Sequence, residues 1–172
     1  MSATTGLPEI TDEVIIDGYT QPGAEATGVV EIYALGPFDS QAFPRLKNIS
    51  ARALIGTGNK ILIGGVIVSG DAAEKVLVRA IGPDLAAFGV KNALQNPTLE
   101  LRDAFGTLLG ANDDWRSDQE DEINATNLPP NDDRDAALVF TLLPGAYTAI
   151  MRGLDESTGT GVVEIYDLSL PQ

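Results

Sequence analysis

The chain has 172 residues and a formal net charge of −14, with 18 glycines, 10 prolines, no cysteine and no histidine. The missing cysteine and histidine exclude disulfides, thiolate and imidazole metal ligands and a Ser-His-Asp triad, so we expect a protein that is not an enzyme. The acidic charge argues against nucleic acid as a partner, and no apolar run reaches the roughly 18–20 residues needed for membrane insertion.

Residues 1–44 are predicted to form an N-terminal arm with a strand at 27–35. Within the arm, residues 7–24 resemble a segment common in bacterial right-handed parallel β-helix surface proteins. This stretch is too short for a stable solenoid stack, so we interpret it as an extended arm that lies on the main domain. The chain opens on polar sequence without a signal peptide. We interpret it as part of a longer secreted protein, located outside the cell or on its surface, in preference to a cytosolic protein.

The sequence TGVVEIY occurs twice, at residues 27–33 (the N-terminal repeat) and at residues 160–166 (the C-terminal repeat). In both repeats β-branched and aromatic residues follow a glycine, which is typical of a β-strand. One repeat is expected to close the sheet of the main domain, and the other then needs a place to pair. We therefore expect a strand-pairing interface formed by Val29, Val30, Glu31, Ile32 and Tyr33.

Residues 45–172 are predicted to form one domain of short strands separated by glycine, proline and asparagine turns. A helical turn is expected at 84–88, ended by Gly89, and a helix at 117–126, begun by a capping box from Ser117 to Glu120. The double glycine at 64–65 indicates a bulge or a close approach of the backbone. The expected strands are 45–55, 60–69, 75–81, 97–103, 107–111, 136–143, 146–152 and 161–168.

This succession of elements predicts the fold class. Many short strands and too few helices to cover a parallel sheet favour an all-β protein. We expect an antiparallel β-sandwich of the jelly-roll type, with one short helix and the N-terminal strand arm outside it.

Two resemblances to known families point to the same architecture. Residues 45–52, 56–58 and 78–83 resemble a repeated module of large bacterial secreted and surface proteins, in which modules often follow one another and each ends in a Val-Glu-x-Tyr-Asp strand. Residues 112–114 and 143–148 resemble the bacterial pre-peptidase C-terminal domain, a jelly-roll sandwich. By these resemblances the domain would be a non-catalytic accessory, adhesive or structural unit.

The segment 112–135 contains nine carboxylates and two arginines. Clustered Asp and Asn on loops can supply the oxygen ligands that calcium requires. The same residues are also typical of solvated turns, in which their side chains bond to the local backbone. Both interpretations stay open. The candidate calcium ligands are Asn112, Asp113, Asp114, Asp132, Asp133 and Asp135.

Trp115 is the only tryptophan and lies beside these acidic residues. Exposed, its ring could stack on a carbohydrate, whereas a lone tryptophan more often packs in a core. Carboxylates are also plentiful enough for glycoside hydrolysis, but the sequence singles out no pair.

Three hypotheses for function follow. The first is a structural or adhesion module that associates with copies of itself, or with neighbouring modules of the same assembly, by donating a strand. Against it stand pairing of the N-terminal repeat within its own chain and its origin in an upstream module of a tandem array. The second is a calcium-dependent module that binds carbohydrate or protein, and the third is a carboxylate hydrolase.

Overall fold

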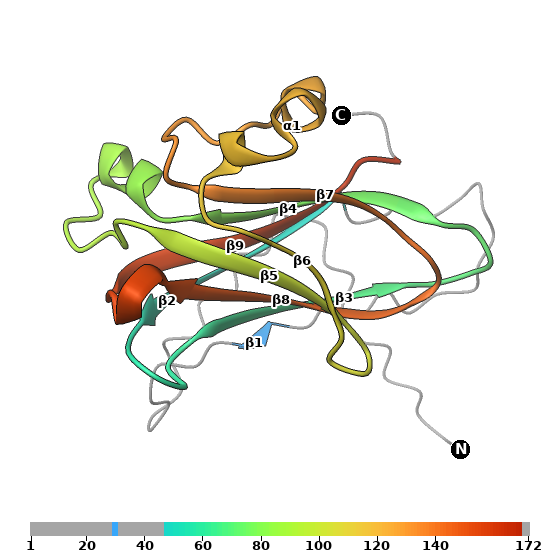
Figure 1. Cartoon of the computed structure of the whole chain (residues 1–172), viewed down its shortest axis with the longest axis horizontal. Helices are drawn as coiled ribbons and strands as arrows, with labels where there is room; N and C mark the ends of the chain where they lie inside the picture. The colour runs from blue at the N-terminus through green and yellow to red at the C-terminus, as the bar shows by residue number, and fades with distance from the viewer. Residues whose placement is uncertain (1–28, 31–46, 170–172) are drawn as a thin grey trace, which may run out of the picture.

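The computed structural model describes residues 29–30 and 47–169, which form two β-sheets stacked face to face (Figure 1). Sheet A has the strand order β1-β3-β8-β5-β6, and sheet B has the order β2-β9-β4-β7. All neighbouring strands are antiparallel except β1 and β3. The strands are β1 (Val29–Val30), β2 (Asn48–Ile55), β3 (Leu62–Val68), β4 (Glu74–Ile81), β5 (Pro97–Asp103), β6 (Leu108–Asn112), β7 (Ala136–Leu142), β8 (Gly145–Gly153) and β9 (Gly159–Asp167).

The connectivity of β2 to β9 is that of a jelly roll. Leaving β1 aside, each sheet has four strands, and the orders β2-β9-β4-β7 and β3-β8-β5-β6 are those of two interleaved Greek keys. The prediction of an antiparallel, jelly-roll-like sandwich is therefore confirmed.

The main core fills the space between the two sheets. Alternate residues of the strands point inward, as the period of two requires. At one point the sheets approach closely, because a side chain on Gly64 would lie 2.9 Å from Val163 Cγ1. The double glycine thus marks a close approach and not a bulge, since β3 and β8 pair without a register shift. The largest fully buried members of this core are Ile55, Leu62, Val78, Leu94, Leu99, Leu101, Met151 and Val163.

A second, smaller core lies on the outer face of sheet B. The 3₁₀ helix η3 (Trp115–Ser117) and the helix α1 (Glu120–Ala125) are part of the long connection between β6 and β7 and cover β4 and β7 (Figure 1). This cover buries Leu77, Trp115, Ile123, Ala137 and Val139. One half of the outer face of sheet B is therefore closed to solvent.

The helix in this cover begins later than the sequence predicts. We expected 117–126 with a capping box at Ser117, but α1 begins at Glu120, and Gln119 precedes it without a side-chain cap. Ser117 instead ends the turn of η3, where its hydroxyl accepts from Asn112 Nδ2 at 3.3 Å. The capping-box prediction was wrong because a tertiary contact takes the serine.

The other helical elements are short. The helical turn expected at 84–88 is the 3₁₀ helix η2 (Pro83–Phe88), and Gly89 ends it in the left-handed conformation, as predicted. A last 3₁₀ turn, η4 (Leu154–Glu156), joins β8 to β9. None of the helices in residues 47–169 has the length and hydropathy needed to cross a membrane.

Only two residues of the predicted arm are described. Val29 and Val30 form β1, which pairs in parallel with Ile63 and Gly64 at the edge of sheet A. The remainder of the strand expected at 27–35, and the segment 7–24, lie outside the described residues. The division into an arm at 1–44 and a domain at 45–172 stays a prediction.

Candidate functional site

The C-terminal repeat is most of β9, and β9 is a central strand. It pairs with β2 on one side and with β4 on the other, so that Glu164 lies opposite both Ser50 and Arg79. We call the place between β2 and β4 the β9 site. A strand in this site has neighbours on both edges, whereas β1 has one neighbour along two residues.

The inner face of the β9 site is shaped for small and branched side chains. Gly161, Val163 and Ile165 face the core and are buried. A side chain on Gly161 would approach Met151 Cε to 2.3 Å and Ile55 Cδ1 to 2.7 Å. At the start of the strand, a side chain on Gly159 would lie 2.7 Å from the backbone of Leu94. The site therefore selects glycine at two positions.

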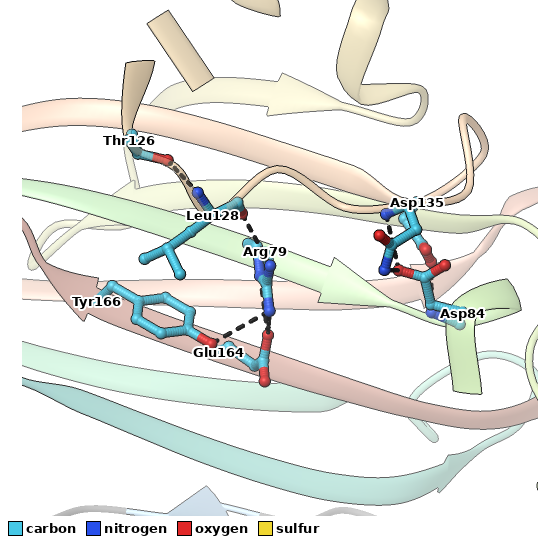
Figure 2. Close-up of polar contacts among 9 residues, drawn as sticks. Arg79, Asp84, Thr126, Leu128, Asp135, Glu164 and Tyr166 are labelled. Atoms are coloured by element: carbon cyan, nitrogen blue, oxygen red, sulfur yellow. Dashed lines mark hydrogen bonds and ion pairs between the residues drawn. The ribbon is translucent and has the colours of Figure 1, made fainter. Parts of the chain in front are cut away.

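The outer face of the β9 site carries a half-buried ion pair. Arg79 of β4 donates through Nε to Glu164 Oε2 at 2.8 Å and through Nη2 to the same oxygen (Figure 2). The exposed fractions of the two side chains are 15% and 17%. Arg79 also donates to Tyr166 Oη at 3.1 Å and to the carbonyl of Leu128 at 2.8 Å. One arginine thus ties β9 to β4 and to the loop that follows α1.

Tyr166 completes this cluster. The Arg79 guanidinium lies over its ring, 5.1 Å from the centroid, and the ring packs against the second core. Burial raises the pKa of the Tyr166 phenol, and the neighbouring Glu164 charge raises it further. The phenol therefore stays protonated at neutral pH and can donate a hydrogen bond.

The two repeats are placed differently. In the predicted interface, Val29 and Val30 lie beside β3, while Glu31, Ile32 and Tyr33 lie outside the described residues. The C-terminal repeat occupies the middle of the other sheet. Val29 and Val30 thus lie in the opposite layer of the sandwich from the C-terminal repeat.

Sheet B also has a long edge. β2 pairs with β9 over all eight of its residues, and no strand among residues 29–30 and 47–169 pairs with its other side. Asn48, Ser50 and Arg52 are exposed on its outer face. An unpaired edge of this length offers backbone donors and acceptors to another chain.

The predicted calcium ligands are dispersed along the loops beside η3. Asp133 and Glu120 both pair with Arg116 at 2.5 Å, and Asp132 pairs with Arg134 at 2.8 Å. Asp132 Oδ1 also accepts from the Arg134 backbone N–H at 3.0 Å, which is the local turn of the alternative interpretation. In the described part of the chain, no three acidic side chains are arranged to hold a metal ion. Calcium binding therefore stays a prediction.

Asn112 and Asp114 hold the local fold of this segment. Asn112 is buried, accepts from the Ala137 backbone N–H at 3.0 Å and donates to the Asp114 carbonyl at 3.1 Å. Asp114 precedes η3, and its carbonyl accepts from the Ser117 N–H at 2.9 Å. Asp113, between them, is partly exposed.

Asp135 is fully buried, which the sequence did not indicate. Its Oδ1 accepts from the Gly82 N–H at 2.6 Å, and its carbonyl accepts from the Trp115 N–H at 2.9 Å. Its Oδ2 has no hydrogen-bond partner among the described residues. Burial raises the pKa of Asp135 to about 7, and the charges of Asp84 and Asp132 add to this. Figure 2 shows Asp84 beside Asp135. Near neutral pH, both the protonated and the ionised form of this carboxyl group are therefore present.

Trp115 lies within the second core with 1% of its surface exposed, and Arg116 lies over its ring, 4.1 Å from the centroid. Its Nε1 is buried and has no partner among the described residues. In this arrangement neither face of the ring is open to a carbohydrate. Of the two interpretations of Trp115, the structure agrees with the second, in which the tryptophan packs in a core.

No protein-family model and no curated protein matches the chain. Among solved structures, the pre-peptidase C-terminal domain of a collagenase from Bacillus anthracis is similar, with a TM-score of 0.43 and 11% identity over 69% of this chain and 89% of that one. PliG of Aeromonas hydrophila, a periplasmic inhibitor of g-type lysozyme, gives a TM-score of 0.46 and 10% identity over 83% and 96%. The first is a domain of the kind that residues 112–114 and 143–148 resemble. Likenesses this remote carry no conclusion about function.

Proposed function

We propose that this chain is a non-catalytic, extracellular structural module that associates with copies of itself, or with neighbouring modules of the same assembly, by pairing β-strands. The observation that carries the proposal is that the sequence TGVVEIY, which forms most of strand β9, occurs a second time near the N-terminal end of the chain. The sandwich uses the C-terminal repeat as β9, and two residues of the N-terminal repeat rest against an edge. The extracellular location rests on the sequence resemblances given above.

Strand pairing can supply affinity without a deep pocket. Backbone hydrogen bonds hold an added strand, and alternate side chains set its register. Among the described strands, β2 has a neighbour on one side only, along eight residues, and β1 pairs with β3 along two residues, so either edge could receive an added strand. These features support an interaction module.

The contacts of three carboxylates in the acidic segment 112–135 support the proposal that the chain is not an enzyme. Asp132 and Asp133 pair with arginines on exposed loops, and Asp135 bonds to the backbone of Gly82 in the interior. Each of these contacts holds the loops in place.

The test is sedimentation velocity of the full chain over a range of concentrations. We expect self-association in the unmodified chain and its loss in Val30→Asp/Ile32→Asp, because two charges would be placed on one face of the donated strand. The matched control is Val14→Asp/Ile16→Asp, which has the same charge and spacing in another part of the arm. Equal association of both variants would contradict the proposal.

A further inference from the structure

We infer that the N-terminal repeat of one chain enters the β9 site of another chain, in place of that chain's own C-terminal repeat. This inference rests on the proposed association and names its partner, a second copy of this chain, and its docking site. Its basis is that the two repeats are identical at every position from Gly161 to Tyr166, which includes Gly161, one of the two glycines that the β9 site selects; the other, Gly159, precedes the C-terminal repeat.

On the inner face the selective positions are matched one by one. Gly28 corresponds to Gly161, the position at which a side chain would run into Met151 and Ile55. Val30 corresponds to Val163, whose methyl groups fill the space left by Gly64. Ile32 corresponds to Ile165, which is also buried in the main core. An exchanged strand would restore this packing without a new cavity or overlap.

On the outer face the electrostatic partners are matched as well. Glu31 and Tyr33 correspond to Glu164 and Tyr166, the two side chains that bond to Arg79. Without them Arg79 would be left half-buried and unpaired, which is costly. Beyond the repeat, Leu35 also corresponds to Leu168, which packs against the second core. The match therefore includes the groups that an unrelated strand would lack.

The match ends at a definite residue. Ala26 takes the place of Gly159, where a Cβ would lie 2.7 Å from the backbone of Leu94. Backbone atoms cannot move aside as the end of a flexible side chain can. The incoming strand is thus expected to pair from residue 27 onward and to leave the sheet before it.

The arrangement of the sheets favours exchange between chains. Val29 and Val30 of the N-terminal repeat pair with β3 in sheet A, while the β9 site lies in the middle of sheet B. A strand of the same sequence that replaces β9 would keep the contacts of the site that it enters. Each chain has one N-terminal repeat and one β9 site, and these are two different surfaces. The contact between chains is therefore head-to-tail and can continue from chain to chain.

The test uses engineered cysteines in the full chain, which has no cysteine of its own. Ile81 of β4 and Val162 of β9 are paired residues on neighbouring antiparallel strands, a separation that a disulfide can bridge. Because β4 lies between β9 and β7, a strand added to the outer edge of β2 would not lie beside Ile81. Ile81→Cys with Val162→Cys in one chain is the positive control and should form an intramolecular disulfide. A Val29→Cys chain, changed at the counterpart of Val162, keeps Glu31 and is then mixed with an Ile81→Cys chain under mild oxidation at a concentration at which the chains associate. A Ser2→Cys chain replaces Val29→Cys as the control for random collision.

We expect a mixed dimer of Val29→Cys and Ile81→Cys, with at least a tenfold excess over the Ser2→Cys control. A yield equal to that of the control would overturn the inference. So would a disulfide that forms only within a single chain carrying both Val29→Cys and Ile81→Cys.

Sedimentation of the same samples separates this inference from the proposed function. Association that depends on residues 30 and 32, without the disulfide between positions 29 and 81, would mean that the repeat pairs with a strand at the edge of a sheet, such as β2. The proposed function would then stand and the β9 site would be the wrong place. Absence of association at every concentration would contradict both the proposed function and the inference about the β9 site.

Discussion

Asp135 shows how a single buried group can set the response of this fold to pH. Its Oδ1 fixes the turn at Gly82, and its backbone fixes Trp115, so the residue joins the end of β4 to the cover of sheet B. The unpartnered Oδ2 makes the ionised form costly in this interior. The stability of the domain should therefore depend on whether this carboxyl group is protonated.

The expected pH dependence has a definite sign. The pKa of Asp135 is about 7 in the folded protein and about 4 for an aspartate in the unfolded chain, so between these two pH values the native state binds more protons than the unfolded state. The contribution of Asp135 to stability is present below about pH 4 and is lost as the pH rises through about 7, by at most about 4 kcal/mol. Chemical denaturation from pH 4 to 8 should show this slope in the unmodified chain. It should be much weaker in Asp135→Asn and unchanged in Asp121→Asn, an exposed residue of α1.

The ion pair of Arg79 permits a matched comparison of the two repeats. Glu164→Gln leaves the guanidinium half-buried without its counterion, and we expect a loss of about 2 kcal/mol, reduced from the cost of a fully buried pair. In dilute solution, where chains are monomeric, Glu31→Gln should change the free energy of unfolding by less than about 0.5 kcal/mol. Urea denaturation of both variants measures the difference, and equal losses would show that the assignment of Glu164 to β9 fails.

At the scale of elements, local sequence predicted the strands well and their contacts poorly. The strand 97–103 was predicted with its observed bounds, since turn residues delimit it on both sides. Gly89 was predicted to end a helical turn because only glycine readily adopts that conformation. By contrast, nothing local distinguishes Ser117 as a partner of Asn112, and the start of α1 was therefore misplaced.

Residues brought together from distant strands were missed for the same reason. Arg79 and Glu164 lie 85 positions apart, and although both stand in stretches that resemble the bacterial repeated module, neither stretch indicates that the two side chains pair. We grouped Asp135 with its acidic neighbours as a candidate calcium ligand. The apolar strand β7 begins directly after it, at Ala136, and this was the signal in the sequence that Asp135 could be buried. Composition predicts a carboxylate cluster, but burial decides which member has an unusual pKa.

The two ends of β9 differ in how much they tolerate a larger residue. Gly159→Ala places a methyl group against the backbone of Leu94, and we expect a loss of about 3 kcal/mol. Gly161→Ala meets the ends of Met151 and Ile55, which can shift, and should cost about 1 kcal/mol. Thermal unfolding of the two variants gives the order, and a larger loss at Gly161 would contradict the packing described for the β9 site.

At the scale of the whole molecule, charge and strand pairing act against each other. A net charge of −14 on 172 residues repels like copies at low ionic strength. Added salt screens this repulsion between exposed charges but has less effect on buried contacts. Association by strand exchange should therefore strengthen from about 0.01 M to about 1 M salt. Sedimentation at both ionic strengths measures it, and weakening with salt would indicate an interface held by surface ion pairs.

The central claim is that the N-terminal repeat becomes a fully paired strand when chains associate. Amide hydrogen exchange read by mass spectrometry tests this most directly, because fragments containing the two repeats differ in their flanking residues. We predict that the amides of residues 28–33 exchange rapidly in dilute solution. On association they should gain protection that approaches that of residues 161–166. Rapid exchange at 28–33 in samples that sedimentation shows to be associated would contradict the account.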